Sequence, residues 1–292
     1  MGELKVGDVV GRKSYGLDIY FKVMDIIEND EKKLALLNGL DMRLCATAPV
    51  EDLERIEAAK VADYWRMAMV KNHEAMKRVF TRRKQERERQ LMRSVEAHKS
   101  SVEVESFDIP GRVLHVDGDG EYLDLCMTTY RQLSIPADGF NIPEREQAEK
   151  IYDLLQEHRP DLLVLTGHDG FKKGTKDFSD INNYYNSMNF VNAVKAARRY
   201  EKSRDDLVIF AGACQSHYEA ILQAGANFAS SPQRVLIHAF DPVFVVEKVA
   251  YTSIYDPIPL KDVITGTITG YDGIGGMETR GKHRLGVPRS PY

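Results

Sequence analysis

Short apolar runs separated by turn residues occupy the first part of the chain, residues 1–55. β-Branched and aromatic residues alternate there with polar ones, and Gly16, Asn29-Asp30 and Asn38-Gly39 supply the turns. Runs of this length and composition predict several short strands, as in a small β-barrel of the SH3-like kind. Barrels of this type bind peptides or RNA, and the fold alone does not choose between the two ligands.

The pattern changes at residues 56–105, which contain few helix breakers and predict a helical linker. Its middle is strongly basic. The basic residues are Lys77, Arg78, Arg82, Arg83, Lys84, Arg87, Arg89 and Arg93. Such a run most often forms a solvated helical face, and a nucleic-acid-binding patch is the functional alternative.

From residue 106 to residue 292, continuous apolar runs alternate with helix-like segments. The predicted strands lie in "GRVLHVDGDG", "DLLVLTGHDG", "DLVIFAGACQS" and "RVLIHAFDP". The predicted helices lie in "PEREQAEKIYDLLQEHRP", "INNYYNSMNFVNAVKAARRYEK" and "HYEAILQAGA", the last ended by Gly225. Apolar strands that alternate with helices predict an α/β domain, with a parallel sheet covered on both faces.

Composition adds limits to this architecture. Hydrophobic residues make up 43% of the chain and charged residues 29%, so a sizeable core is expected. The formal net charge of −4 does not favour a nucleic-acid-binding protein as a whole. We expect no signal peptide and no membrane span, because the first residues lack an apolar segment and no run of 18 apolar residues occurs.

The three cysteines are Cys45, Cys126 and Cys214, which lie far apart and form no CxxC pair. This spacing argues against a disulfide framework and against a thiolate zinc site, and it favours a reducing compartment. We expect neither a metal nor another cofactor.

Chemically useful side chains follow the predicted strands. Asp117 and Asp119 follow the first, His168 and Gly170 the second, and Cys214 the third. Parallel strands bring such ends to one edge of a sheet. A thiol there becomes a nucleophile when a base stands within reach, and His168 is the candidate base. A helix beginning at Cys214 would also favour the thiolate. The backbone N–H groups of Cys214 and Gly170 would bind the oxyanion.

Simpler interpretations remain open for each residue. A single cysteine is more often a small buried side chain than a nucleophile, and a histidine after a strand is commonly a hydrogen-bonded loop residue. His217 is a second candidate base, ranked below His168 because it would lie one turn along the same helix. A metal site at Cys214 and His217 lacks further clustered ligands.

The blocks "LLVLTGHDG" and "LVIFAGACQS" resemble the blocks before the catalytic His-Gly and Ala-Cys of clan CD cysteine peptidases, a group that includes caspases and clostripain. Asp169 stands here where that pattern has glycine, with Gly170 one place later. The whole chain, including "VLHVDGDGEYLDLC", "GACQSHYEA" and "GIGGMETRGKHR", resembles the YabG family of sporulation-specific proteases. The resemblance implies a caspase-like sandwich with Cys214 as nucleophile and His168 as general base.

The family resemblance also implies a function. It implies cleavage after arginine of spore coat or cortex-associated proteins, in the mother-cell cytoplasm or in association with the spore coat. Selectivity for arginine requires a carboxylate in the pocket for that side chain, because a buried guanidinium without a partner is costly. Asp117 and Asp119 are the first candidates, with Asp169 and Asp180 as further ones. The alternative is that "DGDG" is only a tight turn.

Two hypotheses therefore follow from the sequence. The first is an arginine-directed cysteine endopeptidase with protein substrates, which could also cut itself in the basic linker. The possible cut sites are Arg78, Arg82, Arg83, Arg87, Arg89 and Arg93. The second is a non-enzymatic module that binds nucleic acid or a protein through the barrel and the basic helix, attached to an inert α/β domain. It leaves the placement of Cys214 and His168 as a coincidence.

Overall fold

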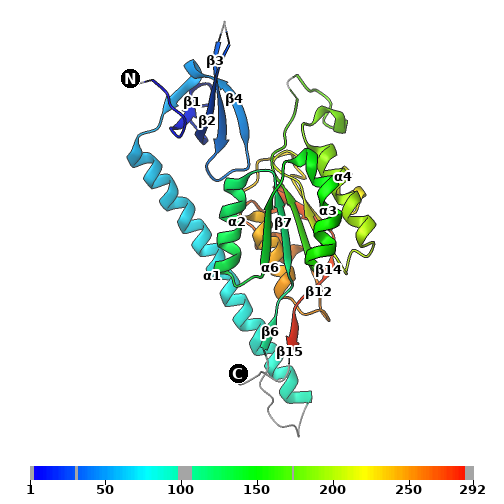
Figure 1. The fold of residues 1–292 in the computed structure, drawn as a ribbon. Coiled ribbons are helices and arrows are strands. Elements are labelled where there is room, and N and C mark those ends of the chain that lie inside the picture. The colour runs from blue at the N-terminus through cyan, green and yellow to red at the C-terminus, as the bar shows by residue number, and fades with distance from the viewer. Residues whose placement is uncertain (1–2, 30–31, 98–106, 173, 287–292) are drawn as a thin grey trace.

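The computed structural model describes residues 3–29, 32–97, 107–172 and 174–286, and for residues 29, 32 and 90–97 the backbone alone. An N-terminal antiparallel sheet and a larger mixed α/β unit lie on either side of the β3–β4 loop, and one long helix runs along both (Figure 1).

The N-terminal sheet has five antiparallel strands in the order β4-β3-β2-β1-β5. The strands are β1 (Val9–Arg12), β2 (Tyr20–Asn29), β3 (Lys32–Gly39), β4 (Cys45–Pro49) and β5 (Leu53–Arg55). Short 3₁₀ helices precede β2 and β5, at Lys13–Tyr15 and Val50–Asp52. Its small core contains Val10, Phe21, Val23, Ala35 and Leu37.

The linker forms one helix, α1 (Ala58–Ala97), as the pattern predicts. Ala75 and Val79 are buried against the α/β unit, so the helix is fastened to it along one side. In the described part of the chain, α1 included, the helices lack an apolar stretch that would let them cross a membrane.

The central sheet has six strands in the order β13-β11-β10-β9-β7-β8, and all neighbours are parallel except β11 and β13. The strands are β7 (Val113–Asp117), β8 (Ala137–Asn141), β9 (Leu162–Thr166), β10 (Val208–Ala211), β11 (Phe228–Ser230) and β13 (Ile274–Gly276). Two small pairs, β6 (Phe107–Ile109) with β15 (Arg284–Gly286) and β12 (Pro257–Ile258) with β14 (Thr279–Arg280), lie outside it.

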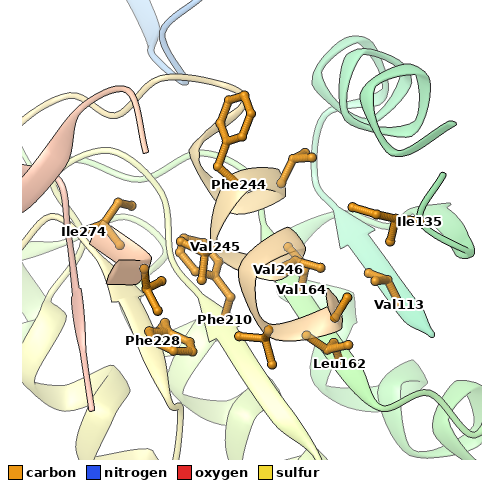
Figure 2. Close-up of a cluster of buried hydrophobic side chains, with 14 of the residues drawn as sticks. Val113, Ile135, Leu162, Val164, Phe210, Phe228, Phe244, Val245, Val246 and Ile274 are labelled. Atoms are coloured by element: carbon orange, nitrogen blue, oxygen red, sulfur yellow. The ribbon is translucent and has the colours of Figure 1, made fainter. Parts of the chain in front are cut away.

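Helices cover both faces of this sheet. They are α2 (Gly120–Gln132), α3 (Glu144–His158), α4 (Ser187–Tyr200), α5 (Tyr218–Ala224), α6 (Asp241–Tyr251) and α7 (Leu260–Ile264), with 3₁₀ turns at Ile181–Asn183 and Gly270–Asp272. Alternate residues of each strand point to opposite faces. Val164 and Phe210 pack with α6 on one face (Figure 2), and Leu163 and Ile209 pack with α3 and α4 on the other.

The α/β class and the helix that ends before Gly225 are confirmed. The fourth predicted strand is wrong: the strand is β11, Phe228–Ser230, and residues 234–239 are a loop with a single bridge at His238. Within the apolar run Val235–Ile237, Ile237 is the fully buried residue, and its carbonyl accepts from the Arg43 N–H of the β3–β4 loop instead of from a neighbouring strand. The SH3-like and caspase-like details stay predictions.

The contact between α1 and α6 generates a stability prediction. Glu247 of α6 is fully buried and pairs with Arg82 and with Arg83, whose Nε is 2.6 Å from its carboxylate. Replacing Glu247 by Ala leaves two partly buried guanidinium groups without their carboxylate partner. The change should lower the free energy of unfolding by about 2 kcal/mol. Denaturant titration measures this loss. The matched change at exposed Glu88 should cost less than about 0.5 kcal/mol, and equal costs would contradict the prediction.

Candidate active site

The carboxyl ends of β10, β9 and β7, which are neighbours in the sheet, bring the predicted residues to one edge. Asp117 ends β7 and Asp119 follows it, His168 lies two residues after β9, and Cys214 lies three residues after β10. This grouping is the one that the strand pattern predicts. The β3–β4 loop of the N-terminal sheet reaches this edge of the sheet.

Cys214 lies in a turn between β10 and α5. Gly212 has φ +111°, and a side chain there would overlap Ser230 Oγ, so the turn requires glycine. The helix starts only at Tyr218, because Gln215 adopts a positive φ of 56° and interrupts helical geometry. The expectation that Cys214 opens a helix is therefore wrong.

The thiol of Cys214 is fully buried. Its Sγ accepts a hydrogen bond from the Ile237 N–H at 3.2 Å and lies 3.8 Å from the Ile237 carbonyl oxygen. Burial raises the pKa of Cys214 to about 12, against the smaller opposing effects of the Ile237 N–H and of Arg43. In this state the cysteine is a neutral thiol and not a thiolate.

His168 lies between two carboxylates. Its Nε2 is 3.3 Å from Asp119 Oδ2 and its Nδ1 is 3.7 Å from Glu144 Oε1, which also accepts the His168 backbone N–H at 2.6 Å. Burial by itself lowers the pKa of His168, but Asp119 and Glu144 together raise it to about 9. The imidazole is therefore protonated at neutral pH. In the described part of the chain, His168 and Cys214 share the sheet edge without a hydrogen bond between them.

The two carboxylate oxygens of Asp119 have different partners. Its Oδ1 caps the start of α2 by accepting the N–H groups of Glu121 and Tyr122, and its Oδ2 faces His168. Asn38 of β3 donates to the same Oδ2 at 2.7 Å. The "DGDG" segment is thus a tight turn and also an electrostatic partner of His168.

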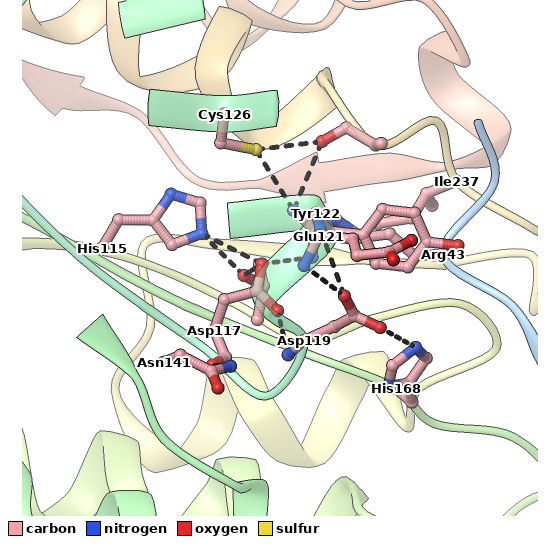
Figure 3. A network of polar contacts seen from close by, with 12 residues as sticks. Arg43, His115, Asp117, Asp119, Glu121, Tyr122, Cys126, Asn141, His168 and Ile237 are labelled. Carbon is pink, nitrogen blue, oxygen red and sulfur yellow. Dashed lines mark hydrogen bonds and ion pairs between the residues drawn. The ribbon is translucent and has the colours of Figure 1, made fainter. Parts of the chain in front are cut away.

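Asp117 forms the most buried ion pair of the site. Its Oδ2 is 2.6 Å from Nη1 of Arg43, and both side chains are fully buried (Figure 3). Thr166 Oγ1 donates to the same oxygen at 2.8 Å. Burial by itself raises the pKa of Asp117, but Arg43 and His115 hold it below its usual range. The carboxylate at the end of β7 therefore holds an arginine side chain.

Arg43 comes from the β3–β4 loop and was not predicted. Its Nη2 contacts Cys126 Sγ at 3.3 Å and the Ala239 carbonyl at 3.4 Å, and its guanidinium lies 5.2 Å from the centre of the Tyr122 ring. A single arginine in a loop of the N-terminal sheet carries no sequence signal for such a position. Glu144 was missed for a similar reason, since it looks like an ordinary first-turn residue of α3.

The remaining predicted residues have other partners. Gly170 donates its N–H to the Asp169 carboxylate at 2.9 Å, and that carboxylate also accepts from Ser187 and Ser216. His217 Nε2 is 2.8 Å from the Ser179 carbonyl oxygen, so this imidazole nitrogen has a partner other than the Cys214 thiol. Asp180 caps a 3₁₀ turn.

Comparison with known proteins assigns the chain to a family. A family model described as YabG peptidase U57 matches residues 5–288. The chain belongs to the YabG peptidase family. It is 38% identical over 287 residues, 98% of each chain, to the sporulation-specific protease YabG of Bacillus subtilis (strain 168). The family resemblance seen in the sequence is confirmed, and the site lies in a sporulation protease.

In this YabG-family chain the basic residues of α1 lie apart from the thiol and imidazole. Arg82 and Arg83 pair with Glu247, and the side chains of Arg78, Arg87 and Arg89 are more exposed. Arg93 lies in the helix, and its side chain is outside the described residues.

The pair between His168 and Asp119 generates a pH prediction. Replacing Asp119 by Asn keeps a helix cap but removes the charge, so the pKa of His168 should fall from about 9 toward the ordinary 6.5. NMR titration of ring-labelled histidine in a Cys214→Ala background measures it. Because the folded pKa is the higher one, the pair stabilises the fold fully below pH 6.5 and loses this effect as pH rises through about 9. An unchanged titration of His168 would reject the pairing.

Proposed function

We propose that the chain is a cysteine endopeptidase that cleaves after arginine, with Cys214 as nucleophile and His168 as the proton-transferring residue. The observation that carries this proposal is the pairing of Arg43 with Asp117 beside Cys214. A fully buried guanidinium, held by a carboxylate, an aromatic ring and a carbonyl oxygen, occupies the position that a substrate arginine would take.

In the proposed reaction, His168 in its neutral form takes the proton of the Cys214 thiol as the sulfur attacks the carbonyl carbon of an arginyl bond and forms a tetrahedral oxyanion. The C–N bond breaks as His168 delivers a proton to the leaving amine, and a thioester remains. Water then hydrolyses the thioester and restores the thiol. The carboxylates Asp119 and Glu144 support the protonated imidazole, which suits a general acid.

The oxyanion needs backbone donors, and the sequence suggested those of Cys214 and Gly170. The Gly170 N–H already donates to Asp169. Among the described residues, the backbone N–H groups of Cys214 and Asp169 have no hydrogen-bond acceptor. We therefore assign the oxyanion to the Cys214 and Asp169 amides, which shifts the second donor by one residue.

Asp117 is the proposed specificity residue for arginine. Arginine donates from a planar fork, whereas lysine presents a single compact ammonium, so a pocket built around Asp117, Tyr122 and the Ala239 carbonyl favours arginine. Asp119 and Asp169 are engaged with His168 and with two serines, which leaves Asp117 as the preferred candidate.

The proposed substrates are proteins of the spore coat and cortex, processed in the mother-cell cytoplasm or at the coat. Membership of a sporulation protease family supports this biological setting. A caspase-like architecture for the α/β unit is supported by the parallel strands whose ends carry His168 and Cys214. An SH3-like barrel is supported by the five antiparallel strands of residues 9–55.

The proposed dyad predicts a specific activity pattern. The wild-type chain should hydrolyse an arginyl fluorogenic peptide better than its lysyl counterpart. Cys214→Ala should abolish turnover, and His168→Ala should lower kcat by at least about 100-fold. Asp117→Asn should lower kcat/KM for the arginyl peptide by at least about 100-fold and have a smaller effect on the lysyl one. Turnover that persists in Cys214→Ala would overturn the proposal.

Self-cleavage in the linker is part of the same proposal. Wild-type chain incubated at high concentration should yield fragments cut after arginines of residues 78–93, and Cys214→Ala should stay intact. The arginines in question are Arg78, Arg82, Arg83, Arg87, Arg89 and Arg93. Intact mass spectrometry and N-terminal sequencing map the cuts, and identical masses for both proteins would remove this part of the proposal.

A further inference from the structure

We infer that the β3–β4 loop, residues 40–44, fills the substrate cleft as a built-in substrate mimic, so that the described state is self-inhibited. The inference rests on the proposed arginine-directed endopeptidase. It identifies residues 237–239 as the edge that binds a substrate main chain, and Arg43 as the occupant of the arginine pocket.

The main chain of the loop is bound like a strand. The Arg43 N–H donates to the Ile237 carbonyl at 3.3 Å, and the Ala239 N–H donates to the Asp41 carbonyl at 2.9 Å. Between them, Met42 and His238 form an antiparallel bridge. Addition of an extended peptide to an exposed backbone edge is a common mode of peptide recognition. Residues 237–239 are not part of the central sheet, so the β3–β4 loop is their strand partner.

The position of Arg43 relative to the thiol fits a substrate. Ile237, whose carbonyl accepts the Arg43 N–H, also contacts Cys214 Sγ through both its N–H and its carbonyl. The backbone of Arg43 therefore lies next to the thiol, while its side chain reaches Asp117. A substrate arginine on the amino side of the cleaved bond needs its backbone beside the thiol and its side chain at Asp117.

The chain after Arg43 continues toward His168. Cys45 is the cross-strand partner of Asn38, and Asn38 donates to Asp119 Oδ2 at 2.7 Å, the oxygen that faces His168. We therefore place the peptide bond between Arg43 and Leu44 between the Cys214 thiol and the His168 imidazole. This is where a leaving amine would receive its proton.

The loop differs from a good substrate in one respect. The Leu44 N–H donates to the Met42 carbonyl at 2.7 Å, which closes a tight turn around Arg43. Tyr122 Oη lies 2.5 Å from the Met42 carbonyl oxygen and 2.6 Å from that of Gly39, so its one proton is shared between them and fixes this turn. An extended substrate would not be bent in this way. The turn therefore holds the bond in a form that resists attack, and the loop acts as an inhibitor.

Two variants release the loop through different contacts. Arg43→Gln removes the ion pair with Asp117, and Tyr122→Phe removes the two hydrogen bonds that fix the turn. Arg55→Gln is the matched control, since Arg55 is a carboxylate-paired arginine of β5, at the edge of the same sheet opposite to β4. Turnover of an arginyl peptide and alkylation of Cys214 by iodoacetamide, mapped by peptide mass, are measured in parallel at one pH.

We expect Arg43→Gln to raise arginyl turnover at least tenfold over wild type, and Tyr122→Phe to raise it less, with Arg55→Gln unchanged. Alkylation of Cys214 should accelerate in the same order, with the Arg55→Gln variant as the reference. A Cys214-dependent cut between Arg43 and Leu44 in wild type would also support the placement.

Other outcomes separate this inference from the proposed function. If Arg43→Gln and Tyr122→Phe melt near the wild-type temperature but turn over no faster than an active wild type, the Arg43–Asp117 pair is only structural and the inference fails. If Arg43→Gln does not fold, Tyr122→Phe alone decides. If Cys214 alkylation accelerates in the variants while none of them hydrolyses arginyl or lysyl peptides, the loop covers the thiol as inferred and the proposed function fails.

Discussion

The buried ion pair between Arg43 and Asp117 is the interaction on which the rest of the structure depends. Moving two charges out of water costs several kcal/mol for each, and the pair recovers this only because Thr166 and the Ala239 carbonyl supply further contacts. Removing Arg43 alone would leave Asp117 as a buried, uncompensated charge. In the proposed endopeptidase, the loop therefore leaves the cleft most easily when another guanidinium takes its place, which makes a substrate arginine its competitor. A tethered competitor also has a high effective concentration, so a weakly bound peptide would not displace it.

The same closed arrangement holds the reacting groups in unreactive forms. Burial raises the pKa of Cys214 to about 12, so the sulfur keeps its proton, and His168, with a pKa of about 9, is already charged. Because desolvation is the largest cause of the raised thiol pKa, opening the cleft to water would lower it. The proposed inhibition and the protonated thiol thus share one cause, the exclusion of water from Cys214, whereas the charge of His168 comes from Asp119 and Glu144.

The sequence was informative wherever local pattern determines position. The apolar runs of β7, β9 and β10 predicted which residues would meet at the sheet edge, because parallel strands end on one side. Arg43 could not be found in this way, since it reaches Asp117 from 74 residues away through a loop of the N-terminal sheet. The run Val235–Ile237 looks like a strand because it is apolar, but it lies outside the sheet, and its Ile237 carbonyl accepts from Arg43 of the β3–β4 loop. The strand in that region, β11, has only three residues and gives too weak a pattern to be recognised.

The geometry also constrains how the linker arginines could reach the site. Arg78 lies 20 positions after the first residue of α1, roughly 30 Å along a straight helix, and the arginines after it lie farther along. Arg82 and Arg83 are held by Glu247 on α6, and a helical segment cannot pair with a backbone edge such as residues 237–239 without unwinding. Asp117 can hold only one guanidinium, so Arg43 must leave before any linker arginine enters. A cut in residues 78–93 therefore requires an already opened site, and the distance along α1 favours a second molecule as its source.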